Sequence, residues 1–150
     1  MADTSFVNGV TVTDASWFND VNRLHYTILG NPANVSTVAA TLNRIPSNPQ
    51  VTTYTLVAGD AGKCLVHSST DNVKRVFILP ANSTVAFPVD TVISFANMAS
   101  SHTVNISSLF DTVRLAGSGN TSSRLLASYG LAAMFKTQST EWIISGTGVS

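Results

Sequence analysis

The residues of this 150-residue chain that could bind metal or react are few and scattered. Histidines stand at His25, His67 and His102, and none has a second histidine or a cysteine at the spacing of a zinc site. The single cysteine, Cys64, opens an apolar run, so we expect a small buried thiol without a disulfide partner. The sequence predicts neither a metal site nor a cofactor.

A catalytic triad could be drawn from Asp60, His67 and one of many serines. The Gly-x-Ser-x-Gly turn that presents such a serine in one hydrolase class is missing from the chain. The segment LAGSGN (115–120) lacks the Lys-Ser/Thr pair of a phosphate-binding loop. Carboxylates that stand in turns or at strand starts are typical turn residues, and they are Asp60, Asp71, Asp90 and Asp111. We therefore predict no catalytic residues and no enzyme activity.

Charge is sparse along the chain. Lys plus Arg and Asp plus Glu number 8 each, so the formal net charge is zero, and charged residues make up 11% of the sequence against a usual ~25%. Basic clusters are missing, so we expect neither nucleic acid nor an anionic membrane surface as a partner. No apolar run is long enough to cross a bilayer, and the polar start MADTSF does not resemble a signal peptide. Ser, Thr and Asn provide the polarity instead, which favours strands and turns.

Residues 1–45 are predicted to form a hairpin followed by two helices. An Asn-Gly pair lies between apolar residues in SFVNGVTV (5–12), which is a strong hairpin signal. A helix over 14–29 ends at Gly30, and a second helix is expected over 35–43. A segment of this size is too short to build a core of its own, so it needs a partner surface.

The first predicted helix carries an apolar stripe. Trp17, Val21, Leu24 and Ile28 follow one another at spacings of 4, 3 and 4, which places them on one helix face. The stripe could pack on the β-rich remainder of the same chain. It could also pack on copies of itself, because this spacing is that of a coiled-coil seam. We expect self-association, with these four residues as the oligomerisation or anchoring interface.

The remainder of the chain changes to a period of two. Residues 46–50, within the proline-rich RIPSNPQ (44–50), are expected to be a linker. Beyond them, eight or nine short alternating runs follow at intervals of roughly 8–12 residues, which is typical of a sandwich or barrel. The sequence therefore predicts a mainly β protein, with an antiparallel β-sandwich or barrel over 51–150 preceded by the short helical segment.

The last two runs, LAAMFKTQ (131–138) and EWIISGTG (141–148), are expected to form a hairpin across a two-residue turn. Trp142 lies in the second of them, on the same face as Ile144. Because a ring of this size needs an earlier strand to cover it, we expect Trp142 in the β-core rather than in a ligand site.

With these elements in place, the chain resembles structural proteins of tailed bacteriophages. The stretch FVNGVTVTDASWFNDVNRLHY (6–26) resembles a motif, Asn-Gly followed by Trp-x-Asn-Asp-Val, found at the virion-proximal ends of many phage fibre and spike proteins. Four later stretches are similar to a β-domain of phage fibre and decoration proteins, namely YTLVAGDAGKCLVHSS, FPVDTVISFANMASSHTVNI, DTVRLAGSGNTSS and EWIISGTG.

The resemblance implies a homotrimer located in the virion and assembled in the host cytoplasm. The stripe of Trp17, Val21, Leu24 and Ile28 would then face two further copies, or a capsid or tail protein. The chain has no long shaft, so a short fibre, a capsid decoration or head fibre, or a tail-fibre adaptor fits best. A knob that binds a receptor or host-surface glycan is the alternative, and a polysaccharide-cleaving hydrolase is a third reading.

Overall fold

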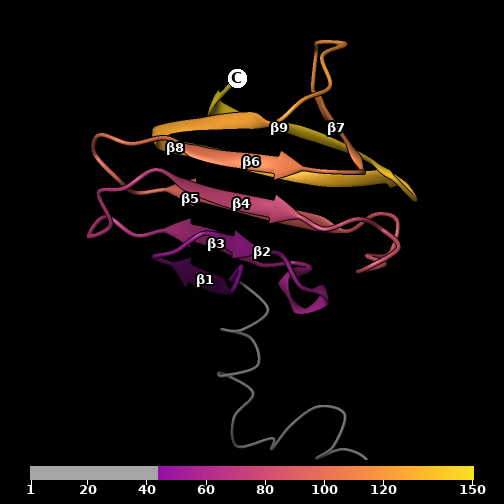
Figure 1. Cartoon of the computed structure of the whole chain (residues 1–150), viewed down its shortest axis with the longest axis horizontal. Helices are drawn as coiled ribbons and strands as arrows, with labels where there is room; N and C mark the ends of the chain where they lie inside the picture. The colour runs from indigo at the N-terminus through magenta and orange to yellow at the C-terminus, as the bar shows by residue number, and fades with distance from the viewer. Residues whose placement is uncertain (1–43) are drawn as a thin grey trace, which may run out of the picture. The chain divides into compact units, whose positions relative to one another are not determined.

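The computed structural model describes residues 44–150 (Figure 1). The chain divides into two units, residues 1–44 and 45–150, and the second unit is the one described below. The hairpin predicted over 5–12, the helices predicted over 14–29 and 35–43, and the apolar stripe all lie outside the described residues. They stay predictions.

Residues 45–150 are mainly β, and their strands belong to a single sheet. The strands are β1 (Ser47–Gln50), β2 (Tyr54–Thr55), β3 (Cys64–His67), β4 (Arg75–Leu79), β5 (Val92–Asn97), β6 (Val104–Ser108), β7 (Thr112–Leu115), β8 (Arg124–Gln138) and β9 (Glu141–Val149). Within this part of the chain the one helical element is the 3-10 turn η2 (Ala58–Asp60). The sheet order is β1-β3-β5-β8-β6-β4-β2, and β9 lies beside β8 with β7 beside β9.

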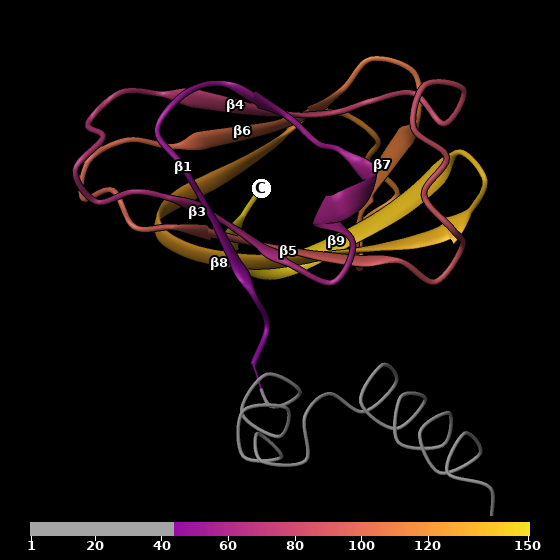
Figure 2. The same ribbon diagram turned by 90° about the horizontal axis from the view of Figure 1, so that it is seen from below.

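The chain winds back and forth between two walls of this sheet. One wall consists of β1, β3 and β5, and the other consists of β2, β4 and β6, with parallel pairing inside each wall. From β1 to β6, consecutive strands alternate between the two walls. We call this winding of the chain through β1–β6 the coil, and each of its turns contributes one strand to each wall. Seen from below, β4 and β6 lie on one side of an elongated ring and β5 and β8 on the other (Figure 2).

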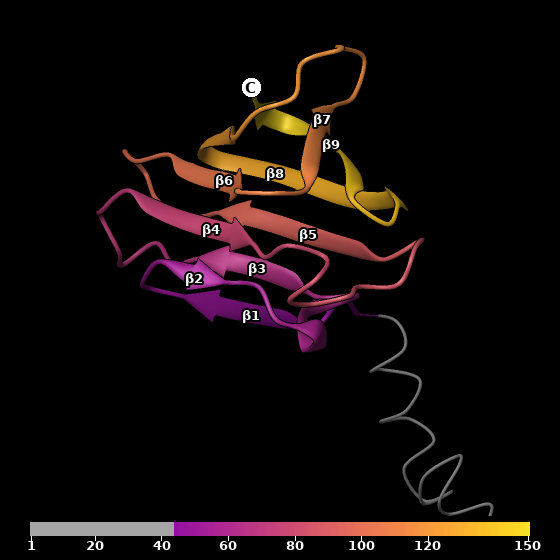
Figure 3. The same cartoon turned by 45° about the vertical axis from the view of Figure 1, so that its right-hand side comes forward.

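Strand β8 joins the two walls. Its first part, Arg124–Leu126, pairs antiparallel with β6, and residues 131–135 pair antiparallel with β5. Between these parts Tyr129 has a φ of 57°, in the left-handed region, and the pairing of β8 with β9 shifts register between Leu126 and Leu131. The sheet is therefore almost closed, like a barrel, with strands stacked from β1 and β2 up to β8 and β9 (Figure 3).

One apolar core fills the interior. Phe77 and Phe95 come from opposite walls, and their rings stack with centroids 6.2 Å apart. Trp142 is fully buried and meets the Phe87 ring edge-on at 5.6 Å. The prediction that Trp142 lies in the β-core is confirmed. So is the final hairpin, because β8 and β9 pair antiparallel across the two residues 139–140.

Two expectations need correction. The sheet is not antiparallel throughout: five strand pairs are parallel and three are antiparallel. The period of two determines which face a residue occupies, but it does not determine the direction of the neighbouring strand. The predicted linker over 46–50 is also wrong for Ser47–Gln50, which form β1. Pro49 is accepted there because β1 is an edge strand with a single neighbour, β3.

Candidate functional site

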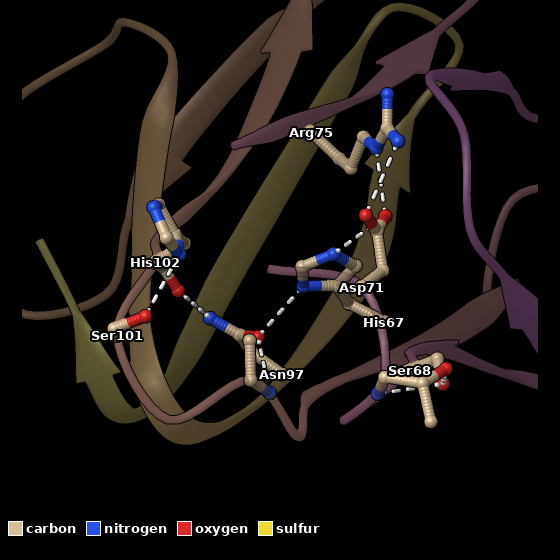
Figure 4. Close-up of polar contacts among 9 residues, drawn as sticks. His67, Ser68, Asp71, Arg75, Asn97, Ser101 and His102 are labelled. Atoms are coloured by element: carbon tan, nitrogen blue, oxygen red, sulfur yellow. Dashed lines mark hydrogen bonds and ion pairs between the residues drawn. The ribbon is translucent and has the colours of Figure 1, made fainter. Parts of the chain in front are cut away.

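A buried polar cluster lies where β3 and β5 end and β4 begins (Figure 4). His67 is the last residue of β3, Asn97 is the last residue of β5, and the two are paired in the sheet register. Both are fully buried, on the same inward face as Leu65 and Phe95. Asp71 follows in the turn after β3 and Arg75 opens β4, so neighbouring elements hold all four side chains. We call His67, Asp71, Arg75 and Asn97 the His67 network.

The Asn97 amide holds three segments together. Its Nδ2 donates to the carbonyl oxygens of His102 at 2.6 Å, Leu126 at 3.2 Å and Ala127 at 3.0 Å. Its Oδ1 accepts from the backbone N–H of Ala99 at 3.1 Å. A flipped amide would point its oxygen at three carbonyl oxygens, so the hydrogen bonds determine the orientation. The end of β5 is thereby tied to the segment before β6 and to β8.

Both ring nitrogens of His67 face oxygen acceptors. Nδ1 lies 2.9 Å from Asn97 Oδ1, and Nε2 lies 3.1 Å from Asp71 Oδ2. A ring that carries protons on both nitrogens donates hydrogen bonds to both oxygens, whereas a neutral ring donates to only one of them. Neither nitrogen is left to activate a nucleophile, and no serine bonds to the ring among the described residues. The triad that the sequence allowed is therefore not assembled around His67.

Asp71 lies between the guanidinium of Arg75 and the imidazole ring of His67. Arg75 donates to it through Nε at 2.7 Å and through Nη2 at 3.1 Å, and Nε2 of His67 lies 3.1 Å from its Oδ2. The hydrogen bonds from Arg75 lower the pKa of the Asp71 carboxyl, and those from His67 add to the effect. The hydrogen bonds to Asp71 in turn raise the pKa of the Arg75 guanidinium. The network is thus a bidentate ion pair that closes one end of the coil.

Asp60, the other proposed triad member, has different partners. It is buried in η2, where its carboxylate accepts from Asn48 Nδ2 at 2.8 Å, the Tyr54 hydroxyl at 3.0 Å and the Val57 backbone N–H at 2.9 Å. Burial raises the pKa of Tyr54, and its hydrogen bond to Asp60 acts in the same direction. Asp60 therefore caps a turn and fastens β1 and β2, in agreement with the turn reading.

The opposite end of the coil contains a buried lysine. Lys136 on β8 donates to Asn82 Oδ1 at 2.6 Å and to the Phe87 carbonyl at 2.8 Å. Its Nζ lies 5.3 Å from the centre of the Trp142 ring, within cation–π distance. Asp111 accepts from Trp142 Nε1 at 3.3 Å and from the Asn82 backbone N–H at 3.1 Å. We call these five residues the Lys136 network.

Cys64 differs from expectation. It is the first residue of β3 and faces the outside of the wall, partly buried rather than enclosed in the core. Partial burial raises the pKa of its thiol. On β3 the side chains that point inward are those of Leu65 and His67. The strand therefore turns the opposite face to the core from the one that a buried Cys64 would require.

The outward side of β8 is apolar, although it is exposed. Leu125, Tyr129, Leu131 and Phe135 all project from it. A shallow groove of about 440 Å³ runs along this side, lined in part by Leu131 and Cys64. At the Lys136 end, a smaller pocket of about 180 Å³ is lined mainly by hydroxyl and carboxyl side chains.

Sequence reasoning missed both networks. Residues 67, 71 and 75 stand four apart across a turn, and this spacing was the available signal for the His67 network. Lys136 shares its strand face with Met134, which was a weak signal for burial. The predicted interface residues Trp17, Val21, Leu24 and Ile28 lie outside the described residues, as does His25. His102 contributes its carbonyl oxygen to the His67 network, while its ring bonds to Ser101.

Comparison of the chain with protein-family models, with curated proteins and with solved structures found no match. Residues 44–150 contain no cluster of three or more His, Cys, Asp or Glu side chains that could hold a metal ion. In the same residues no helix has the length and hydropathy to cross a lipid bilayer. The contacts of the described residues are therefore the basis for a functional proposal, together with the sequence motifs.

Proposed function

We propose that this chain is a non-enzymatic structural component of a tailed-phage virion that works as a homotrimer. A short fibre, a capsid decoration or head fibre, and a tail-fibre adaptor are the three forms it could take. The motif in residues 6–26 is the basis for the phage assignment, and the distribution of polarity in residues 45–150 supports an assembly role. His67 and Lys136 spend their hydrogen bonds inside the fold, whereas the exposed side of β8 is apolar.

This distribution suits assembly better than chemistry. A reaction site needs titratable groups that reach a substrate, and the imidazole and the lysine ammonium are both buried. An assembly module needs a rigid body and an apolar contact surface. In the proposal, residues 1–45 join three copies or anchor them to a capsid or tail protein through Trp17, Val21, Leu24 and Ile28, and the β-domain is displayed outward.

The test is the location of the chain in the virus that encodes it. Antibodies raised against residues 45–150 should label purified particles at discrete positions in electron micrographs. Deletion of the chain should impair particle integrity while adsorption to the host persists. Particles that carry no label would overturn the proposal.

A glycan-binding knob of the same kind of particle is the second candidate. It is favoured by the smaller pocket, which Ser108, Asp111, Thr112 and Thr121 line with polar groups. Phe110, 77% exposed, directly precedes Asp111 in the chain. Hydroxyl and carboxyl groups beside an exposed ring suit a sugar. Binding in a glycan array that Phe110→Ala abolishes would favour this candidate, and loss of adsorption by intact deletion particles would favour it further.

A further inference from the structure

Strand β8 turns a lysine toward the core and large apolar side chains toward solvent, the reverse of the usual arrangement. From Leu131 to the hairpin turn, its inward positions are Ala132, Met134 and Lys136, and its outward positions are Leu131, Ala133 and Phe135. A strand that covers a core normally turns its more apolar side inward. Here the Lys136 network holds a lysine inside, while Leu131 remains 58% exposed and Phe135 40% exposed. This arrangement leaves apolar surface in water unless another surface covers it.

The apolar surface continues on both neighbouring strands. Phe135 stands between Val92 of β5 and Ile143 of β9 in the sheet register, and Ala133 stands between Ser94 and Ser145. We call the outward side of these three strands the β5–β8–β9 face, defined by Val92, Ser94, Leu131, Ala133, Phe135 and Ile143. None of these residues is charged.

Charge begins where the β5–β8–β9 face ends. Arg114 of β7 is paired with Ile143 in the register, and its Nε donates to Glu141 at 2.8 Å. An uncharged centre with an ion pair at its rim is the usual composition of a protein interface. An uncharged face also meets a copy of itself without like-charge repulsion, whatever symmetry relates the copies.

The groove beside this face reaches Ile45, the first residue of the β-domain unit. It is lined by Cys64, Leu131, Ser145 and Ile45, and the last of these is 63% exposed. Residues 1–44, which contain the predicted self-association stripe, are joined to the β-domain at Ile45. The covalent junction to the predicted oligomerisation segment is therefore a residue that lines the groove.

The size of the face indicates how much it contributes. With strands about 4.8 Å apart and outward residues about 6.7 Å apart along each strand, three strands and three rows cover about 300 Å². Two such faces together bury about 600 Å², below the roughly 1,200–2,000 Å² of a stable complex. The face alone is too small for a permanent interface, but it is sufficient as an addition to contacts made by residues 1–45.

We propose that the β5–β8–β9 face packs on further copies of this chain, in addition to the contact predicted for the N-terminal stripe. The inference rests on the proposed function, because it names the second surface of the same oligomer. It also assigns a role to the exposed Leu131 and Phe135, whose side chains lie outside the core of the described residues.

The test uses the full chain and its single cysteine, Cys64, which lines the groove. Leu131→Lys places a charge on the face, and Leu109→Lys makes the same change at a leucine that is 74% exposed and lies outside the face. Oligomeric state is measured by sedimentation at several concentrations, and the alkylation rate of Cys64 is measured with a maleimide. Circular dichroism checks that both variants are folded.

We expect wild-type protein and Leu109→Lys to be oligomeric, with Cys64 alkylated about tenfold more slowly than in Leu131→Lys, because a covered thiol reacts only when the interface opens. If the wild type is oligomeric but Cys64 reacts equally fast in all three proteins, the face is not an interface, and the proposed function survives. A monomer with a protected Cys64 would show that residues 1–44 of the same chain cover the face. Protection that appears only when capsid or tail protein is added would identify a different occupant. Each of the last two results overturns a second copy as the occupant.

Discussion

The two ends of the coil hold a buried polar side chain in place with different partner groups. At each end a buried side chain, His67 or Lys136, lies among oxygen acceptors, and its network ties together strands from both walls. The His67 network adds a carboxylate, Asp71, which is itself held by Arg75. The Lys136 network has no carboxylate within ion-pair distance of the lysine and uses an amide, a carbonyl and the Trp142 ring instead.

The difference shows what each end depends on. A cation held by a carboxylate depends on the protonation of that carboxylate, and so on pH. A cation held by a ring and neutral oxygens depends on the packing that keeps those groups in place. The His67 end should therefore be sensitive to loss of hydrogen bonds and to acid, and the Lys136 end to loss of packing.

The largest expected effect is that of Trp142→Ala at the Lys136 end. It removes a fully buried ring, the cation–π contact with Lys136 and the donor to Asp111. We expect a loss of about 3–5 kcal/mol in the free energy of unfolding, the usual range for a buried aromatic residue. Urea titration followed by circular dichroism measures it.

Fluorescence provides the control for this prediction. In a Trp17→Phe background Trp142 is the only tryptophan, and its emission should be blue-shifted and poorly quenched by acrylamide. Ready quenching with red-shifted emission would show an exposed ring and contradict a packing role at the Lys136 end.

The second effect is that of Asn97→Ala at the His67 end. The substitution removes the amide that bonds to His67 Nδ1, to the Ala99 N–H and to three carbonyl oxygens. Because each buried unpaired polar group costs about 1–3 kcal/mol and some gain water, we expect a loss of on the order of 3 kcal/mol. Asn105→Ala is the matched control, since Asn105 Oδ1 has no hydrogen-bond partner, and it should change stability by less than about 0.5 kcal/mol. Equal effects of the two variants would show that the amide hydrogen bonds contribute nothing.

The third effect separates the ends by pH. Hydrogen bonds from Arg75 lower the pKa of Asp71 in the folded state, so its contribution to stability is complete above the unfolded pKa of about 3.9 and is lost as pH falls through the folded value. The stability advantage of wild type over Asp71→Asn should shrink between about pH 4 and pH 2. Arg75→Gln should weaken the same pH dependence. Urea midpoints measured over this range that differ by a constant amount would contradict the assignment.

The smallest effect concerns one strained residue near each end. Tyr129 in β8 has φ 57°, and Asp90 before β5 has φ 71°. Left-handed backbone costs an ordinary side chain about 1–2 kcal/mol, and aspartate tolerates it better than tyrosine. Glycine relieves this strain but is more flexible in the unfolded chain, so we expect Tyr129→Gly to stabilise by at most about 1 kcal/mol and Asp90→Gly by less. Thermal unfolding that ranks the two variants in the opposite order would argue against the strain.

The sequence was sufficient to predict individual strands but not the partners of most of them. The final hairpin was predictable because its two strands are adjacent in the chain and joined by a two-residue turn. The parallel pairs were not, because β3 and β5 are separated by a strand of the other wall. Ser47–Gln50 were missed because Pro49 argues against a strand unless the strand is known to lie at an edge.

The candidate site was even harder to predict from the sequence than the strand pairing. Alternation on β8 is ambiguous, since apolar residues occupy both faces, and placing the more apolar set inside would have put Lys136 in water. The burial of Lys136 depends on Asn82, Phe87 and Trp142, which meet only in the folded chain. Asn97 gives no sequence signal either, because its partners are backbone carbonyls.

The position of β8 near the end of the chain has a consequence for folding during synthesis. Until residues 124–138 have left the ribosome, β5 and β6 each lack the neighbour that β8 provides, and their backbone groups stay open for pairing. Apart from β8 and β9, strands that are neighbours in the sheet are separated in the chain by at least one other strand, and such contacts form slowly. In a nascent chain, both walls therefore lack a pairing partner until β8 is synthesised, and β8 then pairs with β5 and β6. Chains that stop short of β8 should therefore fail to fold as a whole, so that only completely translated molecules reach the folded state.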